Sequence, residues 1–118
     1  MRDEAWRMAL DALDILDDEA RRALVETADR RFVKSTTTII AQDETDDLVY
    51  LLLEGSVRVV LLSENGQEIW LDWFGAGTIF GEMAALSGKP RTSEIVAETD
   101  CVLAVLTGDR FFALMREH

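Results

Sequence analysis

The spacing of apolar residues changes once near each end of the chain, and these changes separate helical ends from a strand-rich middle. Near the N-terminus, apolar residues recur at steps of three and four positions, as on one face of a helix: Trp6, Ala9, Leu10, Leu13 and Leu16. Asp17 or Asp18 can cap a second helix with a weaker apolar stripe of Ala20, Leu24, Thr27 and Ala28. We therefore predict N-terminal helices within residues 1–30.

Between Phe32 and Leu106 the pattern is that of short strands separated by turns. Apolar and polar positions alternate over residues 56–61 and again over 69–73, and Asn65-Gly66 between them is a strong hairpin signal. Residues 95–97 and 101–106 predict two further strands. Many evenly spaced short strands are typical of a sandwich or barrel, so we predict a β-roll over residues 31–107.

The last residues return to a helical pattern. Thr107 can cap a segment that runs from Asp109 to His118 and offers three large side chains for packing, Phe111, Phe112 and Met115. These side chains exceed what so short a helix can cover, which suggests that the chain continues or that a partner covers its end. The predicted fold class is mainly β with flanking α-helices, a double-stranded, jelly-roll-like β-roll.

Composition narrows the function classes. A chain of 118 residues with 48% hydrophobic and 30% charged residues is long enough for one globular domain. Its formal net charge of -11 argues against direct nucleic-acid binding and against an anionic membrane surface. The single cysteine, Cys101, cannot form an internal disulfide, and its apolar surroundings favour an inert buried thiol, so we expect a reducing compartment such as the cytoplasm. Neither a signal peptide nor an apolar run of membrane-spanning length is recognisable.

Most catalytic and metal sites lack their parts. The only histidine is His118, so zinc sites and Ser-His or Cys-His nucleophiles are not expected, and we predict no enzyme. An acidic cluster lacks the glycine and the final glutamate of an EF-hand, so we interpret it as a solvated turn: Asp43, Glu44, Asp46 and Asp47.

One segment, Phe80 to Ser93, combines groups that suit an anion carrying a hydroxyl. Gly81 precedes a short run of helix-forming residues, and such a turn presents free backbone N–H groups. Arg91 can hold two phosphate oxygens with paired hydrogen bonds. Glu82 would repel a phosphate but would accept a hydrogen bond from a neighbouring hydroxyl, such as that of a ribose. One arginine balances one negative charge, as in a phosphodiester.

This segment resembles the phosphate-binding cassette of cyclic-nucleotide-binding domains, which occur in protein kinase A regulatory subunits, cyclic-nucleotide-gated channels and bacterial catabolite activator proteins. The Phe-Gly-Glu of residues 80–82 and the arginine nine residues later, Arg91, carry the likeness. The strand and glycine turn of residues 48–57 and the turn Phe74-Gly75-Ala76-Gly77 extend it over nearly the whole chain. It implies one domain of residues 1–118, with the cassette at 80–93 and the start of a C-terminal helix at 108–118.

The resemblance also implies a role for each site residue. Glu82 would bind the ribose 2′-hydroxyl and Arg91 the cyclic phosphate of cAMP or cGMP. Backbone groups would line the site at Gly81, Met83 and Ala84, with Thr92 and Ser93 beside the phosphate. Apolar side chains would face the base at Leu61, Ile69 and Leu71. In the family, a threonine directly after the arginine often favours cGMP, so Thr92 keeps cGMP as a candidate ligand beside cAMP.

Each of these residues also has a plainer interpretation. Arg91 could be a salt-bridge partner of Glu82, and Thr92 could simply begin a strand. We favour a role in the hydrophobic core for Leu61, Ile69 and Leu71 over base contacts. The three tryptophans, Trp6, Trp70 and Trp73, are expected to pack, although Trp70 is out of phase with its neighbours and, if exposed, would mark an interface.

Three departures from the family pattern are visible. Thr36 and Asp43 stand where the family has turn glycines, and threonine tolerates a left-handed backbone poorly. Glu94 follows the cassette, where its charge would oppose a phosphate, but strand alternation predicts that it faces outward. The family's lid is a longer C-terminal helix than residues 108–118 provide.

The function implied by this likeness is a regulatory domain that binds a cyclic mononucleotide as an allosteric sensor for an attached or partner effector. The alternative is a β-roll interaction or dimerisation module with an unused nucleotide pocket, and a homodimer remains open. A cupin-type metalloenzyme is remote because no internal histidine is present. No cofactor beyond the nucleotide ligand is expected.

Overall fold

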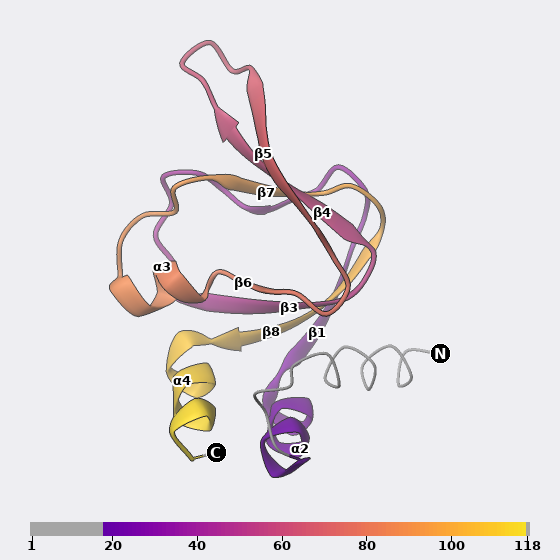
Figure 1. Cartoon of the computed structure of the whole chain (residues 1–118), viewed down its shortest axis with the longest axis vertical. Helices are drawn as coiled ribbons and strands as arrows, with labels where there is room; N and C mark the ends of the chain where they lie inside the picture. Colours follow the sequence, from indigo (N-terminus) through magenta and orange to yellow (C-terminus); the bar gives the residue numbers. More distant parts are fainter. Residues whose placement is uncertain (1–17, 118) are drawn as a thin grey trace.

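Two four-stranded antiparallel sheets form the body of the protein in a computed structural model that describes residues 18–117. The sheet orders are β1-β8-β3-β6 and β2-β7-β4-β5. The strands are β1 (Asp29–Val33), β2 (Thr38–Ile40), β3 (Leu48–Glu54), β4 (Ser56–Leu62), β5 (Glu68–Gly75), β6 (Ile79–Phe80), β7 (Glu94–Ala97) and β8 (Cys101–Thr107). The helices are α2 (Asp18–Thr27), α3 (Glu82–Ser87) and α4 (Gly108–Glu117). The predicted mainly-β fold with flanking helices is confirmed (Figure 1).

The apolar runs of β3 and β8 follow from their position in the middle of the first sheet. One face of each strand packs against α2 and α4, where Leu24, Phe111 and Leu114 are buried with it. The opposite face packs toward the second sheet, with Leu52 and Leu103 in its core. Because side chains of a strand alternate between faces, strands covered on both sides need apolar residues at nearly every position.

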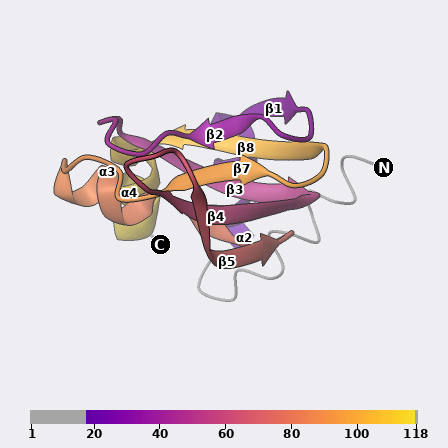
Figure 2. The same cartoon turned by 90° about the horizontal axis from the view of Figure 1, so that it is seen from above.

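The start of α4 agrees with the prediction from the sequence. Leu24, a member of the stripe expected for α2, is buried, and the stripe expected at residues 6–16 lies outside the described residues. Thr107 caps α4, since its Oγ1 accepts a hydrogen bond of 3.2 Å from the backbone N–H of Arg110. Helices α3 and α4 lie at the same end of the strands (Figures 1 and 2).

The predicted β-hairpin at Asn65-Gly66 is confirmed, with residues 63–67 between the two strands. The N–H of Gly66 donates to the carbonyl of Ser63 at 2.9 Å, and Gly66 has a φ of 83°. This is a tight turn closed by a left-handed glycine. The hairpin of β4 and β5 projects beyond the rest of the molecule, at the end opposite α2 and α4 (Figure 1).

A β-bulge interrupts this hairpin and corrects one prediction. Val59 lies opposite Asp72 and Val60 opposite Trp70, which leaves Leu71 without a partner across the ladder. The strict alternation expected on β5 is therefore lost. Leu61, Ile69 and Leu71 are between 36% and 55% exposed, so their interpretation as core residues is wrong.

The tryptophans of β5 also differ from the packing role predicted for them. Trp70 is 60% exposed, as its phase suggested, but Trp73 is 57% exposed as well. The reason is the place of β5 at the edge of its sheet, where only β4 pairs with it. Trp6 lies outside the described residues.

Two smaller predictions are confirmed, those for Thr36 with Asp43 and for Cys101. Thr36 and Asp43 adopt φ angles of 73° and 71°, the left-handed conformation that glycine usually supplies. Cys101 is buried, and that burial raises the pKa of its thiol. Among residues 18–117 no helix is long and apolar enough to cross a membrane.

Candidate functional site

The short helix α3 is bounded by two left-handed glycines that turn the chain sharply. Gly81 has a φ of 91° before the helix and Gly88 a φ of 70° after it. At Gly81 a side chain has no room, because a Cβ atom would lie 3.0 Å from both Arg91 Nη1 and the carbonyl oxygen of Leu48. Glycine therefore lets the start of α3 approach the arginine closely.

A cavity of about 400 Å³ opens between α3, the following segment and the sheets. It is lined by seven of the ten residues for which the sequence predicts a binding role, namely Gly81, Glu82, Met83, Ala84, Arg91, Thr92 and Ser93. Apolar walls come from the strands and the turn before α3, and Lys89 adds a cation. Leu61, Ile69 and Leu71 do not line it, so the structure does not bring these three to the site.

Arg91 is buried, with 4% of its surface exposed. Most of the N–H groups of its guanidinium donate hydrogen bonds to other groups of the protein. Its Nη1 donates to the carbonyl of Gly81 and its Nη2 to the carbonyl of Leu48, both at 2.8 Å. Nε and Nη2 also donate to the two carboxylate oxygens of Asp46. Four of the five N–H groups of the guanidinium are thus used, and one on Nη1 remains for a ligand.

Asp46 is the residue that the sequence analysis missed. It belongs to the acidic cluster interpreted as a solvated turn, and its ion pair with Arg91 corrects that interpretation. Hydrogen bonding from Arg91 lowers the pKa of this carboxyl, against an opposing contribution from burial. The only available signal was the need of a buried arginine for a counter-charge. Within the described part of the chain, no group of three or more potential ligands that could hold a metal ion was found.

Glu82 lies next to this arginine without pairing with it. Its Oε2 is buried and has no hydrogen-bond partner, whereas the ion-pair partner of Arg91 is Asp46. The alternative in which Glu82 and Arg91 form a salt bridge is therefore wrong. A buried carboxylate oxygen without a donor is costly, and a hydroxyl group in the cavity would satisfy it.

The formal charges of the side chains around the cavity cancel. Arg91 and Lys89 supply two positive charges, and Asp46 and Glu82 supply two negative charges. Backbone N–H groups at the start of α3 add partial positive charge, because no side chain caps this helix. Such a site can hold an anion of low charge that also carries a hydroxyl, and it disfavours a triphosphate.

Glu94 does not disturb this balance. Its carboxylate accepts a hydrogen bond of 3.4 Å from the backbone N–H of Gln42, and it is not among the residues that line the cavity. The charge therefore lies away from the site, as strand alternation predicted.

Comparison with known proteins finds a matching family and similar sequences. The model of the family described as "Cyclic nucleotide-binding domain" matches residues 30–118. The cAMP-dependent protein kinase regulatory subunit of Aspergillus niger is 33% identical over 112 residues, which are 95% of this chain and 26% of that protein.

Two solved structures share the fold over most of the chain. The catabolite activator protein of Thermus thermophilus has a TM-score of 0.77 and 30% identity, covering 86% of this chain and 48% of its own. The regulatory subunit of a cAMP-independent protein kinase A from Trypanosoma brucei has a TM-score of 0.80 and 28% identity, covering 90% and 39%. The chain thus spans less than half the length of each of these three relatives.

Proposed function

Since the chain belongs to the cyclic nucleotide-binding domain family, we propose that it binds cAMP or cGMP in the cavity beside α3 and performs no chemistry on it. The observation that carries the proposal is the buried Oε2 of Glu82, which lacks a donor within the cavity that Arg91 also lines. A ribose 2′-hydroxyl beside a cyclic phosphate supplies that donor and the anion together.

The phosphate has two sources of positive charge in this arrangement. Arg91 lines the cavity and keeps one N–H group on Nη1, and the residues at the start of α3, whose N–H groups no side chain caps, line it as well. Asp46 offsets much of the charge of Arg91. The ligand is accordingly expected to carry a single negative charge, as cyclic mononucleotides do, and 5′-AMP with two charges is expected to bind poorly.

Family membership alone does not choose the ligand. One relative is named as cAMP-dependent and another as the regulatory subunit of a cAMP-independent kinase. The choice between cAMP and cGMP falls to residues that face the base, among which Thr92 is exposed at the cavity. We propose that its hydroxyl contributes to that choice.

The proposed role is regulatory, with the output in an attached or partner effector. A ligand shifts a conformational equilibrium only if its affinity differs between the two states. The packing of α3 against the start of α4 offers such a difference, because a Cβ atom on Gly108 would lie 3.0 Å from the Cβ of Ala85. A nucleotide that displaces α3 therefore changes how the start of α4 packs against it.

A second candidate function follows from the same arginine. Four of the five N–H groups of Arg91 already donate to Asp46, Leu48 and Gly81, which favours a structural role in a β-roll interaction or dimerisation module with an unused pocket. In that case nucleotide has no effect on stability, and the substitution Arg91→Lys acts only on the fold.

Calorimetric titration with cAMP, cGMP and 5′-AMP decides between the two. We expect saturable binding of at least one cyclic nucleotide and none of 5′-AMP. Arg91→Ala should weaken binding by about 2–5 kcal/mol, because the phosphate loses a buried counter-charge. The matched control is Arg110→Ala, which removes an equal charge from the exposed side of α4.

Loss of folding is kept separate from loss of binding by recording the thermal midpoint and circular dichroism of each variant. A folded Arg91→Ala protein that binds within tenfold of the parent contradicts the assigned role. Failure of the parent protein to bind either cyclic nucleotide supports the interaction module.

A further inference from the structure

A second surface of interest lies on one face of the β4–β5 hairpin. It is made of residues that do not line the cavity. Trp73 lies directly opposite Arg58 in the ladder between β4 and β5. The guanidinium of Arg58 also lies over the indole of Trp70, 5.7 Å from the ring centroid. These contacts place both exposed tryptophans on the face of the hairpin that carries Arg58, and neither lines the cavity.

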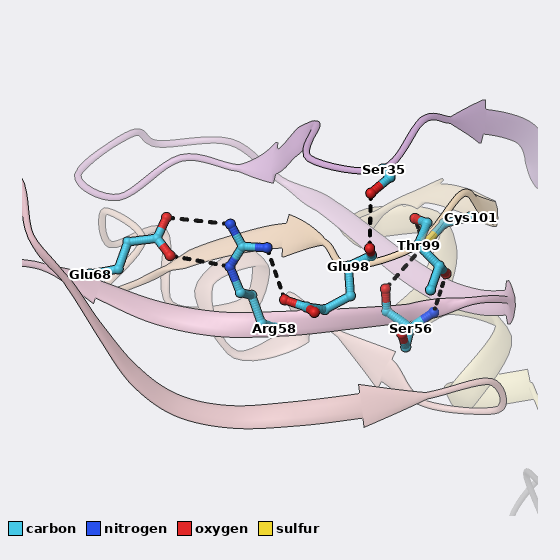
Figure 3. Close-up of polar contacts among 7 residues, drawn as sticks. All are labelled: Ser35, Ser56, Arg58, Glu68, Glu98, Thr99 and Cys101. Atoms are coloured by element: carbon cyan, nitrogen blue, oxygen red, sulfur yellow. Dashed lines mark hydrogen bonds and ion pairs between the residues drawn. The ribbon is translucent and has the colours of Figure 1, made fainter.

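The guanidinium of Arg58 is held in place by two carboxylates (Figure 3). Its Nε donates to Glu68 at 3.2 Å and its Nη1 to Glu98 at 2.8 Å. The positive charge is therefore compensated, and the surface retains an excess of one negative charge. We call this set of five residues the tryptophan face: Arg58, Glu68, Trp70, Trp73 and Glu98.

The tryptophan face contains the residue types that contribute most of the binding energy at protein interfaces. Tryptophan and arginine are enriched among interface residues whose truncation costs most. The two indoles, each more than half exposed, present roughly 300 Å² of largely apolar surface, given about 250 Å² for a whole tryptophan side chain. This area is well below the roughly 800 Å² per partner of a standard interface. An area of this size suits contact with a single helix better than contact with the surface of a globular protein.

We propose that the tryptophan face docks a cationic amphipathic helix of a partner protein. The apolar side of such a helix covers the indoles, and its lysine or arginine residues lie toward Glu68 and Glu98. A second copy of this chain is disfavoured, because the formal net charge of -11 makes two copies repel each other. Strand addition to β5 is also disfavoured, because the bulge at Leu71 interrupts its ladder.

The test uses a fluorescein-labelled peptide of leucine and lysine with amphipathic helical spacing, titrated with the whole chain at physiological salt. A second peptide of the same spacing carries glutamate in place of lysine. The protein variants are Trp70→Thr/Trp73→Thr and, as matched control, Phe32→Thr, which removes another exposed aromatic residue (55% exposed) from β1 of the other sheet. Threonine retains a high preference for strands, and thermal midpoints verify folding.

We expect the lysine peptide to bind and the glutamate peptide not to bind. The double tryptophan variant should lower the affinity at least tenfold, and Phe32→Thr should change it less than twofold. Equal affinity of the double variant and the parent overturns the proposal, because attraction by net charge alone then explains the binding. Self-association in sedimentation that the double variant abolishes also overturns it, in favour of a second copy.

This inference does not rest on the nucleotide proposal. Neither tryptophan lines the cavity, so cAMP and cGMP titrations of the double variant should match those of the parent within twofold. Peptide binding without nucleotide binding leaves the docking proposal standing and contradicts only the proposed function.

Discussion

Asp46 receives hydrogen bonds on both carboxylate oxygens from the guanidinium of Arg91, 45 residues further along the chain. The ion pair between Asp46 and Arg91 links the loop between β2 and β3 to the segment that follows α3. The arginine of the cavity is therefore anchored by a segment that carries no part of the family's cassette. Replacing either partner alone leaves the other charge without compensation near the protein interior.

Asp46→Asn should lower the free energy of unfolding at neutral pH by about 1–2 kcal/mol, because a charge-assisted pair becomes a neutral contact that is partly exposed. The pKa of Asp46 is lowered in the folded state from its ordinary 3.8. The contribution of the pair is thus complete above pH 3.8 and is lost as the pH falls through the lower folded-state pKa.

Urea unfolding of both proteins between about pH 7 and pH 2 measures this difference directly, since the other carboxylates are common to both. We expect the gap between the parent and Asp46→Asn to narrow only below pH 3.8. A gap that stays constant down to the lowest pH contradicts the assignment of the ion pair.

Glu82→Gln should reduce the preference of the protein for cAMP over 2′-deoxy-cAMP. A hydrogen bond to a charged acceptor contributes about 1.5–3 kcal/mol, so the parent should favour the ribonucleotide by roughly tenfold or more. In the variant the preference should fall to a few-fold, while the affinity for the deoxy ligand changes little. Four calorimetric titrations complete this cycle, and an unchanged preference rules out a contact between Glu82 and the hydroxyl.

Gly81→Ala and Gly88→Ala separate backbone strain from close approach. Both glycines are left-handed, so each substitution should cost about 1–2 kcal/mol of stability from the backbone alone. No atom lies within 4 Å of a Cβ built on Gly88, whereas at Gly81 it meets Arg91 and Leu48.

We therefore expect Gly81→Ala to cost about 1–3 kcal/mol more than Gly88→Ala and to weaken nucleotide binding as well. Chemical denaturation of the two variants, with nucleotide titration of each, provides the measurement. Equal losses in the two proteins would show that α3 does not need to approach Arg91 closely.

Thr36→Gly should stabilise the protein. Thr36 has a φ of 73° and is exposed, so glycine relieves about 1–2 kcal/mol of backbone strain. The greater freedom of glycine in the unfolded chain opposes this by about 0.5–1 kcal/mol, which leaves a modest net gain. Thr37→Gly, next to it and without a positive φ, is the control and should lose stability. A loss of stability in both variants contradicts the strain argument.

Local sequence patterns were sufficient for the features that neighbouring residues determine. The hairpin at Asn65-Gly66 and the cap at Thr107 follow from residues within a few positions of one another, whereas the left-handed backbone of Thr36 was expected only from the resemblance to the family. The presence of Glu82 and Arg91 at one cavity was also predictable, because Arg91 follows Glu82 by only nine positions, across one short helix and one turn.

Features that depend on distant pairing were not predictable. The bulge at Leu71 arises from how β4 and β5 align, and one extra residue there reverses which side chains face outward. Asp46 meets Arg91 only through the packing of two loops. Neither arrangement leaves a periodic or local signal in the sequence, so both β5 exposure and the arginine's partner were misinterpreted.

The main chain of Arg91 is held as firmly as its side chain. Its carbonyl accepts from the N–H of Asp43 at 2.8 Å, and its own N–H donates to the carbonyl of Glu44 at 2.7 Å. The amide protons of Asp43 and Arg91, which lie on different loops, are therefore expected to become exposed to solvent in the same local opening of the structure. Their exchange with deuterium should therefore slow together when the cavity is filled, so that Asp43 reports occupancy from outside the binding site.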